Sequence, residues 1–315
     1  MHKFRSIQVL RAVAACAVAY LHCSQNLGAG VGREGYGAFG VDLFFVISGF
    51  IMAQVSQGRS AAGFIRDRLW RIYPLWWIAL LPWLLLLPRG PLVILSSLSL
   101  WPIYGGNYYV PVLQVGWTLS FELLFYLGMA CAILARAWGP LCIYGALLLG
   151  ALTTSSATLH FVGNPLALEF LLGVVVARLP RRPRFAVFAL AGIAAVMITT
   201  PGTGSARSTL LDPAFALWRV FQWGLPAALI VWGVLSSEAM FRRRLFDGPV
   251  VIGDASYSIY LVHPLVAYGL DLAWPLKLAA AIAAGLALHF TVETRIMGLA
   301  RGLRHRTVVD QPATA

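Results

Sequence analysis

Residues 7–23 read IQVLRAVAACAVAYLHC, an apolar run that, with its flanks, is long enough to cross a membrane as one helix. Two ionisable side chains interrupt it, Arg11 and His22. Eleven steps of about 100° amount to about three turns plus 20°, so we expect both on one side of the helix. Their Cα atoms are roughly 16 Å apart along the axis. An ionisable group at such depth costs at least about 2.5 kcal/mol, which marks both as functional candidates.

The composition extends this interpretation to the whole chain. Of its 315 residues, 59% are hydrophobic and 11% are charged, and the mean hydropathy is +0.77. A soluble domain of this size does not need so much apolar surface. The sequence therefore predicts an all-α polytopic membrane helix bundle. We expect about ten transmembrane helices, at 6–24, 39–56, 72–88, 117–135, 139–155, 162–178, 185–201, 218–236, 255–272 and 275–294.

Basic residues fall in five clusters, each of which is expected to face the cytoplasm. An even number of spans must separate neighbouring clusters. Residues 91–104 are too short and too proline-bounded for a span, so we place them as a re-entrant or interfacial segment on the outer face, with both termini in the cytoplasm. The net charge of +12 then reflects topology rather than nucleic-acid binding. The clusters are Lys3 and Arg5; Arg59, Arg66, Arg68 and Arg71; Arg178, Arg181, Arg182 and Arg184; Arg242, Arg243 and Arg244; and Arg295, Arg301, Arg304 and Arg306.

One membrane-embedded domain, residues 1–306, is expected to be followed by a short cytoplasmic tail at 307–315. The four cysteines lie within or at the ends of spans and lack CxxC spacing. We interpret them as small packing residues rather than disulfide partners, and we expect no metal site.

Three ionisable residues are expected at one depth near the outer face. His22 ends the first span, Asp42 begins the second, and Glu122 lies about one turn into the fourth. A carboxylate beside an imidazole fixes its tautomer and raises its basicity, as a general base for a hydroxyl requires. His22 is therefore the candidate base, with Asp42 or Glu122 orienting it. Other readings stay open: an interfacial His22, Asp42 as a helix N-cap, and Glu122 as a cap or as the partner of an arginine.

Arg68 and Arg71 lie in the basic segment RDRLWR before the third span, three residues apart, and would share one face of a helix. Guanidinium forks match phosphate oxygens. The alternative is that they only set the topology, as basic residues of any inner loop do. Arg11 could extend to the inner headgroups, but its place on the His22 side favours a polar path through the bundle.

A second outer feature is the aromatic stretch LWPIYGGNYYVPVLQVGW at 100–117, with a turn at 105–107. Aromatic rings at this depth can form an interfacial belt or offer their faces to sugar rings. In a later span, a histidine followed by proline is expected to line a cavity. The candidate substrate-binding residues are Trp101, Tyr104, Tyr108, Tyr109, Trp117 and His263.

Five segments carry recognisable motifs: SIQVLRAVAACAVAYLH at 6–22, FGVDLFFVISGFIM at 39–52, FIRDRLWRIYPLWW at 64–77, VGWTLSFELLFY at 115–126 and GDASYSIYLVHP at 253–264. Together they resemble the acyltransferase 3 family of bacterial integral-membrane acyltransferases, most closely its exopolysaccharide O-acetyltransferase branch. The resemblance covers nearly the whole chain. HFTVETRI near the C-terminus lacks the proline that relatives commonly have after the glutamate, so Glu293 is assigned no role.

The resemblance implies a bacterial inner-membrane enzyme that takes an acyl group, usually acetyl from cytoplasmic acetyl-CoA, and places it on a carbohydrate hydroxyl at the outer face. It implies that Arg11 and His22 are the functional pair and that Arg68 and Arg71 bind the CoA phosphates. The expected partners are acyl-CoA, a free or lipid-linked saccharide acceptor, membrane lipids and the polysaccharide biosynthesis machinery.

We expect an O-acetyltransferase that modifies an exopolysaccharide or another cell-surface glycan, by direct transfer or through an acetyl-His intermediate. Two other classes fit the same polar residues. One is a multi-pass transporter with a proton relay through Arg11, His22, Asp42 and His263, although no inverted repeat is visible. The other is a flippase-like subunit of polysaccharide export.

The topology can be tested by cysteine labelling. A cysteine in place of Asn107 is expected to react with an impermeant thiol reagent from outside, and one in place of Arg182 only from the cytoplasm, because charge parity puts the two positions on opposite faces. Labelling is compared in intact and permeabilised cells, in a background without native cysteines. Labelling of position 107 solely from the cytoplasm would overturn the ten-span arrangement.

Overall fold

The computed structural model describes residues 4–24, 33–87, 89–104, 108–109, 111–135, 139–199 and 212–309. Nearly all of this part of the chain is helical, which confirms the predicted all-α bundle. The strands in this part form one antiparallel hairpin with two residues in each strand, β1 (Ile103–Tyr104) and β2 (Tyr108–Tyr109). The predicted turn at 105–107, with the labelling position Asn107, lies outside the described residues.

The elements of the first half are α1 (Arg5–Ser24), η2 (Arg33–Ala38), α2 (Phe39–Val55), α3 (Ala61–Leu86), α4 (Pro91–Ser99), α5 (Gly116–Ala135), α6 (Gly139–Thr153) and α7 (Ala157–Val162). Those of the second half are α8 (Ala167–Arg178), η3 (Pro183–Ala186), α9 (Val187–Ile198), α11 (Pro213–Arg219), η4 (Val220–Gly224), α12 (Leu225–Leu235), η5 (Met240–Arg242), η6 (Arg244–Phe246), α13 (Asp247–Asp254), α14 (Ser256–Gly269), α15 (Trp274–Leu288), η7 (His289–Glu293) and α16 (Thr294–Val309).

Seven helical segments of the described chain are long and apolar enough to cross a membrane. α14 and the helix before it, which meet at a bend of 64°, make an eighth if the two form one span. Two shorter apolar helices lie at Pro140–Thr153 and Pro183–Ile198. A helix is therefore present at each of the ten predicted spans. The number that cross, and the side on which the termini lie, stay predictions.

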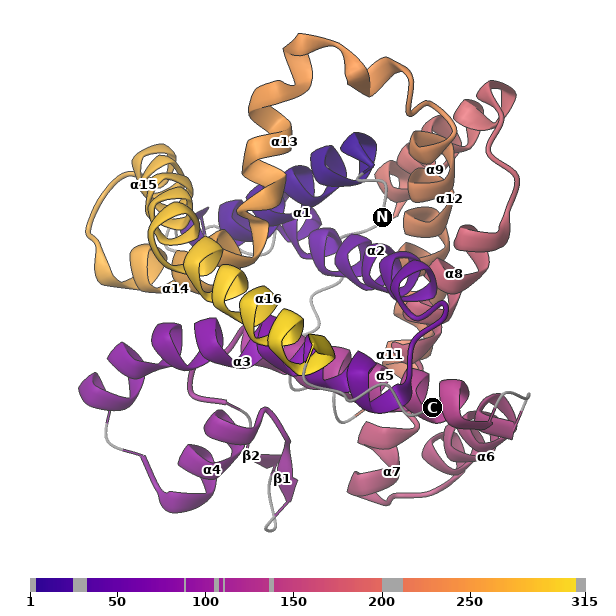
Figure 1. Ribbon diagram of the computed structural model, residues 1–315, viewed down its shortest axis with the longest axis horizontal. Helices are drawn as coiled ribbons and strands as arrows, with labels where there is room; N and C mark the ends of the chain where they lie inside the picture. Colours follow the sequence, from indigo (N-terminus) through magenta and orange to yellow (C-terminus); the bar gives the residue numbers. More distant parts are fainter. Residues whose placement is uncertain are drawn as a thin grey trace.

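α1 and α2 lie at the centre of the bundle, and the other helices flank them (Figure 1). α1 packs against α13, α14 and α15, whereas α2 packs mainly against α8 and also contacts α5 and α12. α9 packs on α12, and α3 lies along α5. Side chains of α1, α2, α3, α5 and α14 can therefore meet in one interior space.

Aromatic rings fill the core between α2, α5 and α8. The ring of Phe170 stacks between those of Phe45 and Phe125, at centroid distances of 4.5 and 4.6 Å. On the outward faces, large apolar side chains are left exposed, for example Leu85 at 75% and Ile198 at 86%. An apolar surface of this kind suits a lipid environment rather than water, in agreement with a membrane bundle.

α3 begins earlier than the predicted span at 72–88. Its N-cap is Ser60, whose hydroxyl accepts from the Gly63 backbone N–H at 3.2 Å, and Pro74 lies inside the helix. The basic segment RDRLWR is thus helical, and Arg68 and Arg71 lie one turn apart on α3, as their spacing predicts.

The segment after α3 folds back onto it. α4 has nine residues, roughly 14 Å of helix, which is too short to cross an apolar layer of about 30 Å. The indole N–H of Trp76 donates to the Ser97 carbonyl at 2.8 Å, and the Tyr73 hydroxyl donates to the Ser99 carbonyl at 2.6 Å. These bonds fix α4 against α3 and agree with a segment that does not span.

Glycines let α2 approach α8 backbone to backbone. A Cβ atom on Gly49 would lie 1.9 Å from the Phe170 carbonyl oxygen, and one on Gly173 would lie 2.0 Å from the Val46 carbonyl oxygen. No flexible side chain separates the helices at these points. A small residue at position 49 thus permits close packing of the two helices.

Gly49→Ala is expected to lower the thermal unfolding midpoint in detergent, because overpacking a helix contact costs about 1–3 kcal/mol. The matched control is Gly128→Ala in α5, where an added Cβ meets nothing within 4 Å. The control should be neutral or slightly stabilising, since alanine favours helix. Equal midpoints for the two variants would show that the close approach of α2 and α8 is wrong.

Candidate active site

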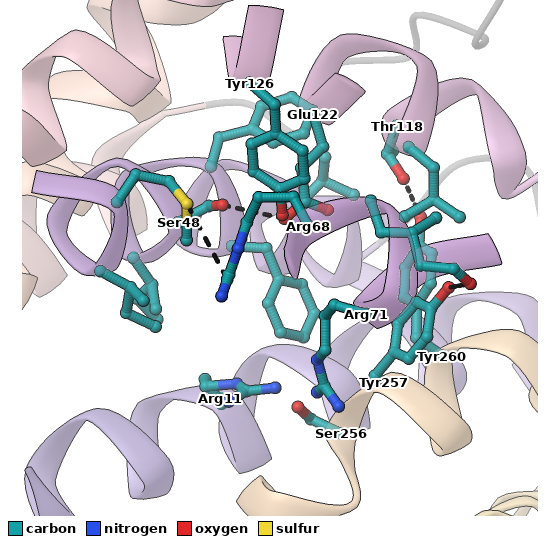
Figure 2. Close-up of a pocket in the computed structure, with 18 residues that line it drawn as sticks. Arg11, Ser48, Arg68, Arg71, Thr118, Glu122, Tyr126, Ser256, Tyr257 and Tyr260 are labelled. Atoms are coloured by element: carbon teal, nitrogen blue, oxygen red, sulfur yellow. Dashed lines mark hydrogen bonds between the residues drawn. The ribbon is translucent and has the colours of Figure 1, made fainter. Parts of the chain in front are cut away.

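A cavity that is partly open to the surroundings lies between α1, α2, α3, α5 and α14. Its α2 wall extends from Val41 to Met52, twelve residues or roughly 16 Å of helix. The cavity is therefore elongated along α2. The polar side chains that line it are Arg11, Ser48, Arg68, Arg71, Thr118, Glu122, Tyr126, Ser256, Tyr257 and Tyr260 (Figure 2).

Three arginines point into this cavity, Arg11 from α1 and Arg68 and Arg71 from α3 (Figure 2). Arg71 forms an ion pair with Glu293, and its guanidinium lies 5.2 Å from the centre of the Tyr257 ring. Its charge is thus neutralised within the protein. Glu293, which was assigned no role from the sequence, is placed by η7 against α3.

The other two arginines form no ion pair with any residue that the structure describes. Arg11 has a single long hydrogen bond, 3.4 Å from its Nη1 to Gln8 Oε1. The Nη1 of Arg68 lies 4.0 Å from the Met52 sulfur, and its buried Nε has no hydrogen-bond partner within the described part of the chain. A buried donor without an acceptor is costly, so these two groups are suited to an anionic ligand.

Glu122 lies in this cavity rather than beside His22. It accepts hydrogen bonds from the Ser48 hydroxyl at 2.9 Å and from the Tyr126 hydroxyl one turn further along α5. The expectation that Glu122 orients His22 is therefore corrected. Its carboxylate points toward α2, because this face of α5 packs on Ser48.

Asp42 is also engaged elsewhere. Its two carboxylate oxygens accept from Nε and Nη2 of Arg219 at 2.9 and 2.8 Å. Arg219 also donates to the Ala38 carbonyl and lies 5.1 Å from the centre of the Trp223 ring. Asp42 belongs to the first turn of α2 without capping it. Both the orienting role toward His22 and the N-cap alternative are corrected, because the buried carboxylate is held by a buried cation.

His22 instead contacts a second histidine. Its Nδ1 lies 2.8 Å from Nε2 of His263, and the two rings stack with centroids 4.9 Å apart. His263 is 0% exposed and does not line the cavity, in contrast to the expectation from the sequence. Tyr260, one turn earlier on α14, does line the cavity, and its ring centre is 5.7 Å from that of His263. The Tyr260 side chain therefore lies between the cavity and the histidine pair.

Arg11 and His22 both face α14, as their spacing predicts. Arg11 meets the residues at the start of α14 in the cavity, and His22 meets His263 two turns further along. The cavity with Arg11 and the histidine pair are consequently arranged one after the other along the interface between α1 and α14.

The aromatic stretch at 100–117 is only partly described. Trp101 packs edge to face on Phe161 at 5.2 Å, and Trp117 packs in the same manner on Phe45 at 6.4 Å. Both rings belong to the core packing. Tyr104, Tyr108 and Tyr109 form the hairpin, but their side chains lie outside the described part, so a carbohydrate platform here stays a prediction.

Three buried ionisable residues inside apolar segments escaped the sequence analysis, Glu169, Arg219 and Lys277, and a fourth, Glu293, was assigned no role. Glu169 lies beside the Asp42–Arg219 pair, and Nζ of Lys277 donates to the Ala267 carbonyl at 2.9 Å. Each of these charges interrupts an apolar segment, and this signal in the sequence could have identified them. Their partners lie on other helices, and the sequence does not indicate which.

Comparison with known proteins agrees with this arrangement. The Acyl_transf_3 model, described as an acyltransferase domain, matches residues 4–292. The chain is similar to the exopolysaccharide production protein ExoZ of Rhizobium meliloti (strain 1021), 35% identical over 257 residues that make up 72% of this chain and 75% of that protein. No solved structure matches it significantly. Because the family match spans almost the whole helix bundle, with the cavity and both histidines, the chain belongs to the Acyl_transf_3 family and is a multi-pass membrane acyltransferase.

Proposed function

We propose that this protein is an O-acetyltransferase of the bacterial inner membrane, which moves an acetyl group from cytoplasmic acetyl-CoA to a hydroxyl of an exopolysaccharide. The observation that carries the proposal is the elongated cavity. Inside it lie Arg11 and Arg68, which form no ion pair with a described residue, and the His22–His263 pair lies beyond its Tyr260 wall. Acyl transfer follows from the family. The polysaccharide acceptor is supported by the name of the similar protein from Rhizobium meliloti.

Arg11 and Arg68 are the residues best suited to the CoA phosphates. Charge-assisted hydrogen bonds from guanidinium to phosphate are short and strong, and phosphate oxygens would satisfy the buried Nε of Arg68. Arg71 already has Glu293. The donor pair that the sequence predicts, Arg68 with Arg71, therefore becomes Arg11 with Arg68 in this proposal, and Arg71 shapes the cavity together with Tyr257.

His22 is the proposed general base. It takes the proton from the acceptor hydroxyl as the oxygen attacks the acyl carbon, and it returns that proton to the CoA sulfur when the C–S bond breaks. The thioester supplies an acyl carbon that is activated for this attack. An acetyl-His intermediate would use the same ring nitrogen as nucleophile. His22 is partly exposed near the end of α1, where an acceptor from the outer side could reach it.

Removing the base tests the proposal. His22→Ala is expected to lower acetyl transfer by about 10²- to 10⁴-fold, the usual loss for a general base, in a protein that still inserts and folds. The acetyl content of the secreted polysaccharide, measured by ¹H NMR, and CoA release by the purified protein report the transfer. The control is His160→Ala on α7, a half-buried histidine outside the cavity lining.

Wild-type acetylation in the His22 variant would refute the catalytic assignment. A wild-type protein that releases no CoA, in cells whose polysaccharide export still depends on it, would favour the transporter or flippase alternative.

The donor site predicts a graded effect on CoA affinity. Arg11→Ala and Arg68→Ala should each weaken CoA binding by roughly 1.5–3 kcal/mol, about tenfold to a hundredfold, for the lost charged hydrogen bonds. Arg68→Lys should restore part of the affinity, since lysine offers a point charge but no fork. Isothermal titration of the purified variants with CoA measures this.

The matched control is Arg66→Ala, an exposed arginine two residues away in the same basic segment, and it should leave CoA affinity unchanged. If Arg66→Ala and Arg68→Ala had equal effects, α3 would contribute only a diffuse positive charge, and the donor would bind elsewhere.

A further inference from the structure

We infer that His263 is a positioning residue, which holds His22 in the tautomer that carries its proton on Nδ1. Nε2 of His22 is then the unprotonated nitrogen that acts as base. This inference rests on the proposed role of His22 and deepens it by naming the reacting atom and the group that prepares it.

The hydrogen bonds from the Ile259 carbonyl through His263 to His22 allow one neutral arrangement. His22 also has a backbone hydrogen bond to Val18, one turn earlier on α1, whose carbonyl can only accept. Nδ1 of His263 lies 3.2 Å from the Ile259 carbonyl oxygen, one turn earlier on α14. A carbonyl can only accept, so Nδ1 of His263 carries a proton and, in the neutral ring, its Nε2 carries a lone pair. That lone pair faces Nδ1 of His22 at 2.8 Å. Nδ1 of His22 must therefore donate, and its Nε2 is left free to accept.

The reverse arrangement requires a charged His263. If Nε2 of His263 donated to His22 while Nδ1 donated to the carbonyl, the His263 ring would be an imidazolium. The side chain is fully buried, and no described carboxylate contacts it. A buried charge without a partner costs several kcal/mol, so the neutral arrangement is favoured.

Packing holds the two rings at this distance. Ala15 of α1 and Ala255 and Ile259 of the neighbouring segment form a small, fully buried cluster at the interface between α1 and α14. The small side chains of Ala15 and Ala255 let the two helices come close together. The interface thus supplies His263 as the partner that fixes the tautomer of His22. This role was expected of Asp42 or Glu122.

The tautomer can be observed without any activity assay. In purified protein labelled with [¹⁵N]histidine, the two ring nitrogens of His22 are assigned by the signals that His22→Ala removes from the six histidines of the chain. The wild-type spectrum should show a protonated Nδ1 and an unprotonated Nε2 on His22. His263→Leu should shift His22 to a mixture of tautomers. A wild-type His22 with its proton on Nε2, or a spectrum unchanged by His263→Leu, would overturn the inference.

Kinetics provide a second readout. His263→Leu should lower kcat by about 10²- to 10⁴-fold, the range known for loss of a base or of its tautomer control, with KM for acetyl-CoA unchanged. His263→Gln should recover most of this loss, because its Oε1 can accept near the former Nε2 position. The control is His160→Leu, which should behave as wild type. Equal losses in the Leu and Gln variants, at unchanged unfolding midpoints, would contradict the positioning role.

The two readouts separate this inference from the proposed function. If His22→Ala kept full activity while the NMR spectrum still showed the Nδ1 tautomer, the function of His22 would be wrong and the positioning by His263 right. If His22→Ala were inactive and the tautomer did not depend on His263, the function would stand and this inference would fall.

Discussion

Charged side chains inside a bundle of apolar helices are costly unless each is paired, and the interior of this protein is organised around that requirement. Asp42 is held by Arg219 and Glu293 is held by Arg71, in each case across helices that are far apart in the sequence. Two cations, Arg11 and Arg68, have no described acidic partner of their own. Their charge suits the cavity to an anion, and the proposed donor chemistry depends on this excess of positive charge.

The helix α14 connects the two parts of the site. Its first turns contribute Ser256, Tyr257 and Tyr260 to the cavity, and its next turn contributes His263 to the histidine pair. α1 runs beside it with Arg11 at one level and His22 at the other. The tight packing of these two helices therefore sets the distance between the anion-binding end and the proposed base. A rearrangement of this interface would affect both the proposed binding of the donor and the proposed transfer at His22.

The sequence predicted the features that are local to one segment. The positions of the helices, the common face of Arg11 and His22, and the helical pairing of Arg68 with Arg71 all follow from hydropathy and from the geometry of a single helix. Partnerships between helices did not follow: Asp42 pairs with a residue 177 positions away and Arg71 with one 222 positions away. The π-helical turn η7, which ends at Glu293, has no sequence signal that we could use. Shared depth in the membrane placed Asp42, Glu122 and His22 together, although depth does not determine which way a side chain turns around its helix.

The central claim is that the acyl group enters from the side of the basic loops and is transferred at His22 on the other side. Inside-out membrane vesicles that contain this protein and enclose deacetylated polysaccharide test it directly, with [¹⁴C]acetyl-CoA supplied only to the exposed cytoplasmic face. The account predicts radiolabel on the enclosed polysaccharide, at a rate that collapses in vesicles carrying His22→Ala. Labelling that requires acetyl-CoA inside the vesicles, or that proceeds equally well with the variant, would contradict it.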